Sequence, residues 1–286
     1  MSNVLLADSG SSKTDWVLVA EGVVVSRFQS AGLNPYFLSP DRITEEIRKS
    51  LPGGFDTAIP DEVFFYGSGC TAPERLGEVR GAIRAVFPYT EVWVDSDLLG
   101  AARALFGLET GLVGILGTGS NVCLYDGNQI TAGIRSLGFL FGDWGSGAVI
   151  GKELVTCYLR KEMPEPLLMA FEKWHGQSFE QILERSYRNE RPSRYLASFV
   201  PFLSQHKDDQ WVSTLLKDSF DDFFRYMVYD LPQPKFYPFG AIGSVAFYFQ
   251  DFLCESALKA GFDSIRVLAA PIDGLISFHG NQGTIT

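Results

Sequence analysis

The sequence predicts an α/β fold with two halves of similar topology. Short apolar runs alternate with segments of helical periodicity, which is typical of sheets flanked by helices. A strand–turn–strand pattern around Gly10 recurs around Gly117, 107 residues further along the chain. At roughly 150 residues per domain, the 286 residues also favour two domains. We therefore expect one domain over residues 1–108 and a second over 109–286, with the last helix either in the second domain or packed back on the first.

The first half begins with three strands joined by tight turns. Residues 4–7, 16–20 and 23–28 are apolar or β-rich runs separated by polar, glycine-containing turns, which predicts an antiparallel meander. Segments with apolar residues at helical spacing then alternate with short apolar runs. The predicted helices are 41–50, 75–87 and 98–106, and the predicted strands are 62–66 and 91–94.

The second half repeats the meander and then becomes more helical. Residues 111–116, 122–125 and 129–134 show the same pattern of strands and turns as the start of the chain. After them we expect helices over 147–161, 178–188, 194–205, 211–228 and 245–260, strands over 237–242 and 265–268, and a short closing helix over 272–278.

Composition excludes several classes of function. The chain has 24 Lys and Arg against 34 Asp and Glu, a net charge of −10, so we expect no nucleic-acid partner. No run of about 18 apolar residues predicts a membrane span. The first residues lack the basic and apolar regions of a signal peptide, so we expect a cytoplasmic protein. The four Cys and three His lack the spacing of a metal site, which favours reduced thiols.

Three turns made of small residues each follow a predicted buried strand. They are residues 10–12, 117–120 and 240–244. Such turns let backbone N–H groups approach an anion, and their hydroxyls add further donors, so they predict phosphate binding. The first turn is not a P-loop because a strand follows it, and none of the three is the dinucleotide fingerprint.

Four polar residues are candidates for chemistry near these turns. Asp8 ends the first strand beside the first turn, where a carboxylate tolerates a phosphate if Mg²⁺ lies between them. Asp97 follows a buried strand and is a helix cap, a role that Ser96 could also take, a general base for a substrate hydroxyl, or both. Asp143 lies in a loop with three glycines. Asn34 is either a turn residue or an amide that binds a sugar hydroxyl.

Together these motifs resemble one branch of a known superfamily. Their order along the chain is similar to that of the N-acetylglucosamine kinase and BadF/BadG-type ATPase family, within the actin/hexokinase/Hsp70 superfamily. The resemblance spans residues 8–274. It implies two similar lobes of ribonuclease-H-like, or actin-like ATPase, topology around a central cleft that takes ATP and substrate.

The resemblance also implies a role for each motif. Asp97 matches the base that deprotonates the 6-hydroxyl of an amino sugar such as N-acetylglucosamine, with Mg²⁺ bridging the ATP phosphates. The residues that match ATP-binding positions are Gly10, Ser11, Ser12, Lys13, Thr14, Gly117, Thr118, Gly119, Ser120, Gly243 and Ser244. The residues that match sugar-binding positions are Asn34, Asp97, Ser136, Leu137, Gly138 and Asp143. Asp8 is the expected metal ligand.

Two departures from the family pattern leave alternatives open. The first turn reads Ser-Gly-Ser-Ser instead of Gly-Gly-Gly-Thr, and Trp144 replaces a Glu. A sugar kinase is the leading hypothesis. One alternative is an ATPase that activates a partner enzyme, in which Cys123 and Cys157 would hold an iron–sulfur cluster. Another is a non-catalytic regulator that binds a nucleotide or a sugar. A homodimer is an open alternative to a monomer.

Overall fold

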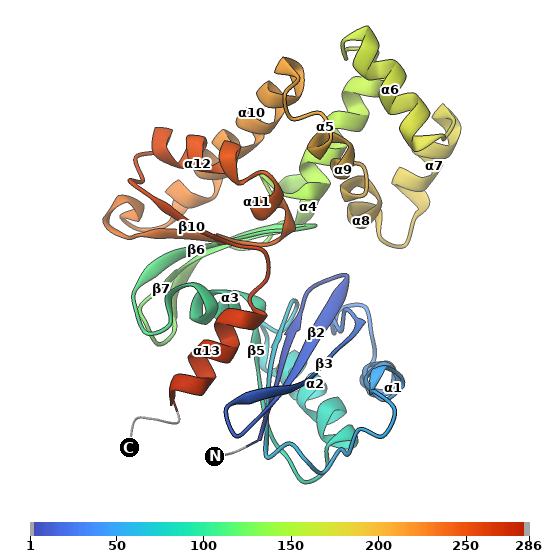
Figure 1. Ribbon diagram of the computed structural model, residues 1–286. Helices are drawn as coiled ribbons and strands as arrows, with labels where there is room; N and C mark the ends of the chain where they lie inside the picture. Colours follow the sequence, from blue (N-terminus) through green and yellow to red (C-terminus); the bar gives the residue numbers. More distant parts are fainter. Residues whose placement is uncertain (1–2, 283–286) are drawn as a thin grey trace. The chain divides into compact units, whose positions relative to one another are not determined.

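The computed structural model describes residues 3–282, which divide into two compact units. Unit 1 holds the described residues up to 109, residues 127–129 and the segment from residue 270 onward, and unit 2 holds residues 110–126 and 130–269. Figure 1 follows the chain through both. No helix in the described part of the chain is both long and apolar enough to cross a membrane.

Unit 1 is built on a five-stranded sheet in the order β3-β2-β1-β4-β5. The strands are β1 (Val4–Ser9), β2 (Lys13–Ala20), β3 (Val23–Ala31), β4 (Glu62–Gly67) and β5 (Glu91–Ser96). The first three form the predicted antiparallel meander, and β4 and β5 run parallel to β1. The carboxyl ends of β1, β4 and β5 therefore meet at one edge, where Gly67 lies between Ser9 and Ser96.

Helices cover both faces of this sheet, because alternate strand residues point to opposite sides. The helices of unit 1 are α1 (Pro40–Ser50), α2 (Pro73–Val86), α3 (Asp97–Phe106) and α13 (Ile272–Gln282). Leu5 and Ala7 of β1 share a buried cluster with Ile43 and Ile47 of α1. Helices α3 and α13 pack against each other and against β1. Figure 1 shows α1 and α13 on opposite sides of the strands.

A buried polar contact fastens α13 to the rest of unit 1. The hydroxyl of Tyr66 on β4 lies 2.9 Å from Nε2 of His279 on α13, and Arg103 on α3 donates to the same hydroxyl at 2.7 Å. Because Tyr66 accepts from Arg103, its own proton goes to His279, which is held as a neutral acceptor. Burial, and after it the charge of Arg103, lower the pKa of His279 to about 4.

Unit 2 repeats the sheet of unit 1. Its strands are β6 (Gly111–Leu116), β7 (Ser120–Tyr125), β8 (Ile130–Gly133), β9 (Phe239–Ile242) and β10 (Ile265–Leu268), in the order β10-β9-β6-β7-β8. β6, β7 and β8 are antiparallel, whereas β9 and β10 run parallel to β6. The order and directions match those of unit 1, so the predicted internal duplication and the two similar α/β halves are confirmed.

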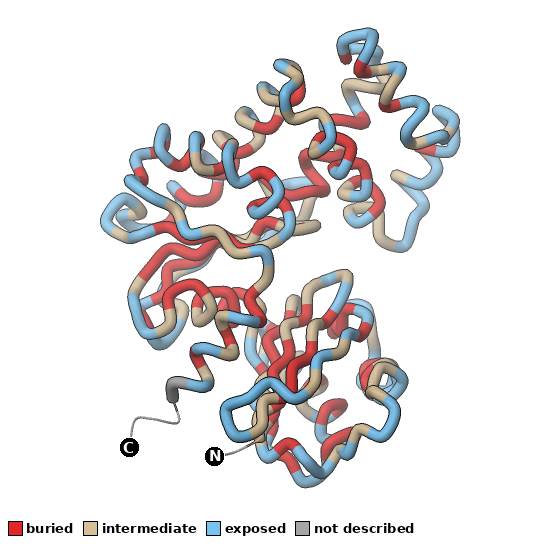
Figure 2. The backbone as a smooth tube through the Cα atoms, viewed as in Figure 1, coloured by how far each residue is buried: buried red, intermediate tan, exposed pale blue. Residues whose placement is uncertain are grey.

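Helices make up the rest of unit 2. They are α4 (Gly138–Phe141), α5 (Gly147–Leu159), α6 (Glu165–His175), α7 (Phe179–Arg188), α8 (Pro192–Ala197), α9 (Val200–Ser204), α10 (Gln210–Tyr226), α11 (Ser244–Tyr248) and α12 (Gln250–Lys259), with 3₁₀ turns η1 (Val228–Asp230) and η2 (Pro234–Phe236). Figure 2 shows that the buried residues follow the sheet and the helix faces turned toward it.

Two predicted helices of unit 2 are each broken in two. The helix expected over 194–205 is instead α8 and α9, because Pro201 has no N–H and its ring would clash with the carbonyl of Ala197 in a continuous helix. The helix expected over 245–260 is interrupted at Phe249, which leaves the helical conformation (φ −116°, ψ 27°) and is buried.

Candidate active site

The first small-residue turn connects β1 and β2 and is closed by its own hydrogen bonds. The N–H of Gly10 donates to the carbonyl of Lys13 at 3.0 Å. The buried hydroxyl of Thr14 lies 2.8 Å from that of Ser9 and donates to the carbonyl of Ala31 at 3.0 Å. Thr14, an expected ATP ligand, thus has a hydroxyl that already holds the hairpin together.

The tip of the same turn lies closer to the surface. Ser11 and Lys13 are exposed and Ser12 is partly exposed. Lys13 forms an ion pair with Asp15 at 2.8 Å. The residues at the tip, rather than Thr14, are therefore accessible to a ligand.

Asp97 is the first residue of α3, at the carboxyl end of β5. The cap of this helix is Ser96, whose hydroxyl accepts from the N–H of Leu99. The Asp97 carboxylate accepts from the N–H of Leu98 at 2.9 Å and from its own N–H. Burial raises the pKa of Asp97 to about 6, and the two N–H groups oppose that rise. Asp97 is thus oriented by the helix start while Ser96 carries the capping role.

Asp8 lies on β1 at the same edge of the sheet as Asp97. Burial, and after it the charges of Asp97 and Asp15, raise the pKa of Asp8 to about 8, against an opposing effect of Lys13. A buried carboxyl among other acids is a favourable place for a cation. Within residues 3–282, however, no three His, Cys, Asp or Glu side chains converge on a common metal position. Asp8 therefore fits an ion that takes one protein carboxylate and draws its other ligands from phosphate and water.

Asn34 lies beside the end of β4. Its side-chain oxygen accepts from the N–H of Tyr36 at 2.9 Å, and its Nδ2 donates to the hydroxyl of Ser68 at 3.4 Å. The N–H of Ser68 donates to the carbonyl of Ser9 at 2.8 Å. The contacts therefore bring Asn34 to the edge of the sheet that carries the two acids. The amide is also oriented: its oxygen accepts from Tyr36, one N–H points to Ser68, and the second N–H is the group available to a ligand.

The second small-residue turn lies in unit 2, between β6 and β7. The N–H of Gly117 donates to the carbonyl of Gly119 at 2.9 Å. The carbonyls of Gly117 and Thr118 accept from the N–H groups of Gly147 and Ala148, at 2.8 and 3.0 Å. The first turn of α5 is thus capped by the hairpin, so any anion at this position would meet the turn itself rather than the helix start.

Asp143 is bound to this second turn. Its carboxylate accepts from the N–H of Ser120, and burial raises its pKa to about 6. Its backbone is in the left-handed region (φ 52°), and a Cβ on Gly119 would lie 3.0 Å from its Oδ2. The hydroxyl of Ser120 donates to the carbonyl of Trp144 at 2.7 Å. Ser120, another expected ATP ligand, therefore ties the two loops together.

The third small-residue turn touches the second. A Cβ on Gly243 would collide with the carbonyl of Leu116, and the left-handed backbone of Gly243 (φ 122°) also favours glycine. Gly243 donates its N–H to Leu268 at 3.0 Å, and Ser244 is exposed at the start of α11. Gly243 and Gly117 are therefore neighbours in unit 2.

The segment expected to hold the sugar in unit 2 lies at the surface. Ser136 and Leu137 are exposed, and Gly138 has a left-handed backbone (φ 69°) where α4 begins. A Cβ on Gly142 would lie 3.2 Å from the Cβ of Leu137, so this segment borders the loop of Asp143.

Comparison with known proteins identifies the family. No protein-family model matches the chain, and no curated protein matches it. The structure of a "putative N-acetylglucosamine kinase" from Porphyromonas gingivalis is 40% identical, with a TM-score of 0.94, covering 98% of this chain and 100% of its own. The chain belongs to the N-acetylglucosamine kinase family.

More distant structures share the fold of this kinase family. A second protein of the same description, from Chromobacterium violaceum, is 16% identical with a TM-score of 0.74, covering 97% of this chain and 99% of its own. A ROK family glucokinase from Streptomyces griseus, in complex with glucose and AMPPNP, is 16% identical with a TM-score of 0.53 and covers 97% of each chain. These matches confirm the actin-like ATPase topology predicted from the sequence.

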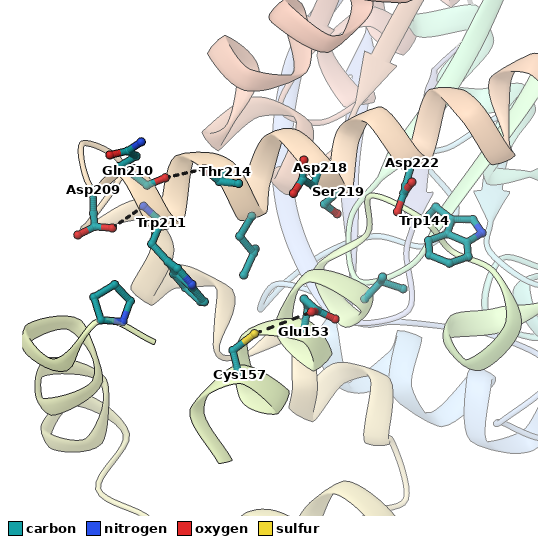
Figure 3. Close-up of a pocket in the computed structure, with 13 residues that line it drawn as sticks. Trp144, Glu153, Cys157, Asp209, Gln210, Trp211, Thr214, Asp218, Ser219 and Asp222 are labelled. Atoms are coloured by element: carbon teal, nitrogen blue, oxygen red, sulfur yellow. Dashed lines mark hydrogen bonds between the residues drawn. The ribbon is translucent and has the colours of Figure 1, made fainter. Parts of the chain in front are cut away.

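Trp144, which replaces a Glu of the family pattern, packs inside unit 2. Its ring lies 4.9 Å from that of Tyr226, at 33°. It closes one end of a cavity of about 730 Å³ between α5 and α10, shown in Figure 3. Four carboxylates line this cavity, and none of the described residues around it is Lys or Arg. That charge repels phosphate, so the cavity does not suit a nucleotide.

The sequence interpretation missed part of the site in unit 1. Ser68 and Gly69 follow β4 just as Gly243 and Ser244 follow β9, and β4 and β9 hold the same place in their sheets. Ser68 contacts Asn34, and a Cβ on Gly69 would lie 2.5 Å from the Asn34 side-chain oxygen. The internal duplication is the signal that points to these two residues.

Proposed function

We propose that this protein is an ATP-dependent kinase that phosphorylates N-acetylglucosamine or a related amino sugar at the 6-hydroxyl. Membership of the family supports a sugar kinase that uses ATP. The observation that carries the proposal is Asp97, a carboxylate oriented by two N–H groups at the end of a parallel strand, with a pKa raised to about 6 by burial. A base needs a pKa close to the working pH, and a fixed orientation, to accept the hydroxyl proton.

Phosphoryl transfer depends mainly on positioning and on charge neutralisation. Asp97 would take the proton of the 6-hydroxyl while Asn34 donates to another hydroxyl of the sugar. Asp8 would hold Mg²⁺, which when bound offsets the charge of the phosphates. The raised pKa of Asp8, caused by burial and by neighbouring acids, supports a cation beside it.

The three small-residue turns are the proposed ATP ligands. Backbone N–H groups and hydroxyls in such turns suit phosphate oxygens and ribose. Thr14 and Ser120 would act indirectly, because their hydroxyls hold the turns in shape. The proposed direct ligands are Gly10, Ser11, Ser12 and Lys13 in the first turn, Gly117, Thr118 and Gly119 in the second, and Gly243 and Ser244 in the third. Asp143 and the segment Ser136–Gly138 are the proposed sugar contacts of unit 2.

The test is Mg²⁺-dependent ADP release with and without a panel of sugars headed by N-acetylglucosamine. We expect stimulation by an amino sugar in the wild type. Asp97→Asn should still bind ATP and sugar but lose sugar-dependent ADP release by about 100-fold or more, because general base catalysis contributes on that scale.

The matched control is Asp95→Asn. Asp95 lies on β5 two residues before Asp97, is exposed, and its side chain accepts the adjacent N–H of Ser96. The Asp95→Asn substitution should leave sugar-dependent turnover unchanged. If Asp97→Asn retains turnover, Asp97 is not the base. If no sugar stimulates ADP release by the wild type, the kinase proposal is contradicted.

The activator ATPase receives no support from its two cysteines. Cys123 is fully buried in the middle of β7, so its thiol does not reach the surface to share a cluster with a second subunit. Cys157 lies on α5 beside Glu153, in the acidic cavity between α5 and α10. The sugar kinase is therefore the one function proposed.

A further inference from the structure

Two aromatic side chains are exposed immediately after Asn34. Tyr36 is 59% exposed and Phe37 is 65% exposed. Aromatic rings supply large apolar surfaces and are usually at least partly covered, so two open rings beside a polar site suggest a ligand that covers them.

Tyr36 is held by two contacts that leave much of the residue exposed. The guanidinium carbon of Arg75 lies 5.3 Å from the ring centre, and Arg75 is itself held by Glu78 at 2.8 Å. A Cβ on Gly69 would lie 2.9 Å from Cδ2 of Tyr36, so the edge of the ring rests against the backbone there. With Arg75 against the ring, 59% of Tyr36 is still exposed, so surface remains for a ligand to cover. The ring is preorganised rather than free to rotate into solvent.

The same residue orients the amide of Asn34. The backbone N–H of Tyr36 donates to the side-chain oxygen of Asn34, which leaves the amide nitrogen to donate to a hydroxyl. A flat apolar ring and an oriented donor therefore lie side by side at one edge of the sheet. A sugar in its ring form presents that combination, because C–H bonds make up much of each face and hydroxyls surround its rim.

We propose that Tyr36 is the platform on which the ring of the sugar substrate lies. This inference rests on the proposed function and extends it to substrate recognition: Tyr36 contacts the C–H face of a pyranose while Asn34 donates to one of its hydroxyls. The platform contributes equally to the ground state and the transition state, because the sugar ring does not change during transfer to the 6-hydroxyl. Its loss should therefore raise KM and spare kcat.

The key variant is Tyr36→Ala. The hydrogen bond to Asn34 comes from the backbone of residue 36, so this change removes the ring and keeps the orientation of the amide. We expect KM for N-acetylglucosamine to rise about tenfold, with kcat and the KM for ATP within about twofold of wild type. Tyr36→Phe and Tyr36→Trp keep an aromatic face and should restore the KM to within about threefold.

Tyr89→Ala is the matched control. Tyr89 is 84% exposed and precedes β5, so it lies at the opposite end of that strand from Asp97. Its removal should change neither constant. If Tyr36→Ala has the same KM as wild type while the wild type phosphorylates the sugar, the platform is wrong and the kinase function stands.

A second readout separates the two proposals. If the wild type shows no sugar-dependent turnover, the proposed function fails, and sugar binding is then followed by saturation-transfer NMR with N-acetylglucosamine alone. Signals on the sugar ring protons that disappear in Tyr36→Ala would support the platform. Signals that persist in the variant, or that are missing in the wild type, would overturn it.

Discussion

Burial sets the chemistry of Asp97. The carboxyl lies where a strand ends and a helix begins, and desolvation moves its pKa to about 6 even though two N–H groups stabilise its charged form. The sequence motif singles out Asp97 but does not distinguish a cap from a base, because Ser and Asp both cap helices. The structure separates them: Ser96 binds the N–H of Leu99, and Asp97 keeps an oriented carboxylate. By contrast, no pattern in the sequence indicates that Asn34 meets Ser68, since that contact depends on strand order.

The raised pKa predicts how activity depends on pH. A general base works only when ionised, so kcat/KM should rise with pH through about 6 as Asp97 loses its proton. The pKa of Asp8 is raised to about 8, so the assay contains saturating Mg²⁺, which would hold Asp8 ionised over the same range. The profile is measured from pH 5 to pH 8 with both substrates well below saturation, so that it reports the free enzyme. The residual activity of Asp97→Asn should lack this limb. A limb that persists unchanged in the variant would assign the titration to another group.

Helix α13 shows how one element depends on a neutral histidine. Its contact with β4 and α3 uses His279 as an acceptor, next to the charge of Arg103. At this scale the sequence predicted the strands well, because each is a short apolar run bounded by turn residues. It missed α6, whose first turn lies among Pro164 and Pro166, and it joined α8 to α9 across Pro201. Proline marks the start of a helix as often as its end, so pattern alone misplaces such boundaries.

Acid should weaken the attachment of α13. The pKa of His279 is lowered to about 4 in the folded protein from 6.5, so between these values the unfolded state binds more protons and stability falls as pH falls. From pH 7 to pH 5 this one group should cost about 2 kcal/mol of unfolding free energy. Urea titrations at both pH values measure the loss. His279→Gln keeps an acceptor but does not titrate, so the variant should lose less unfolding free energy between pH 7 and pH 5, by that amount. Equal losses in the variant and the wild type would contradict the role of His279.

The molecule contains two sheets with the same order of strands. Neither unit is one continuous half of the chain. Unit 1 takes residues 127–129 from between the two segments of unit 2, and α13 from after the second segment. Duplicated turns after Gly10 and Gly117 predict the paired architecture, because each unit needs the same hairpin at its start. No local pattern in the sequence predicts that these segments belong to unit 1. Their placement appears in close packing, such as Gly274 on α13, where a Cβ would meet Ala104 of α3.

Removing α13 should therefore damage unit 1 rather than unit 2. A chain that stops after residue 269 loses the buried side chains Leu275 and Phe278, each worth about 1.5–3 kcal/mol. We expect a lower unfolding midpoint in urea and the loss of sugar-dependent ADP release. A chain that stops after residue 280 keeps both side chains and His279, and should match the wild type. Unchanged stability of the shorter chain would show that α13 is dispensable.

The return of α13 to unit 1 also affects the order of events during synthesis. Domains near the start of a chain generally fold first as they leave the ribosome. Here β1 to β5 emerge early, but the face that carries Phe64 and Tyr66 waits for a partner that is translated after every other described element. The helix that begins at Asp97 is thus made in the first half of synthesis but meets its partner α13 only at the end. A nascent chain stalled before α13 would carry Asp97 at the start of a helix that still lacks the partner it packs against.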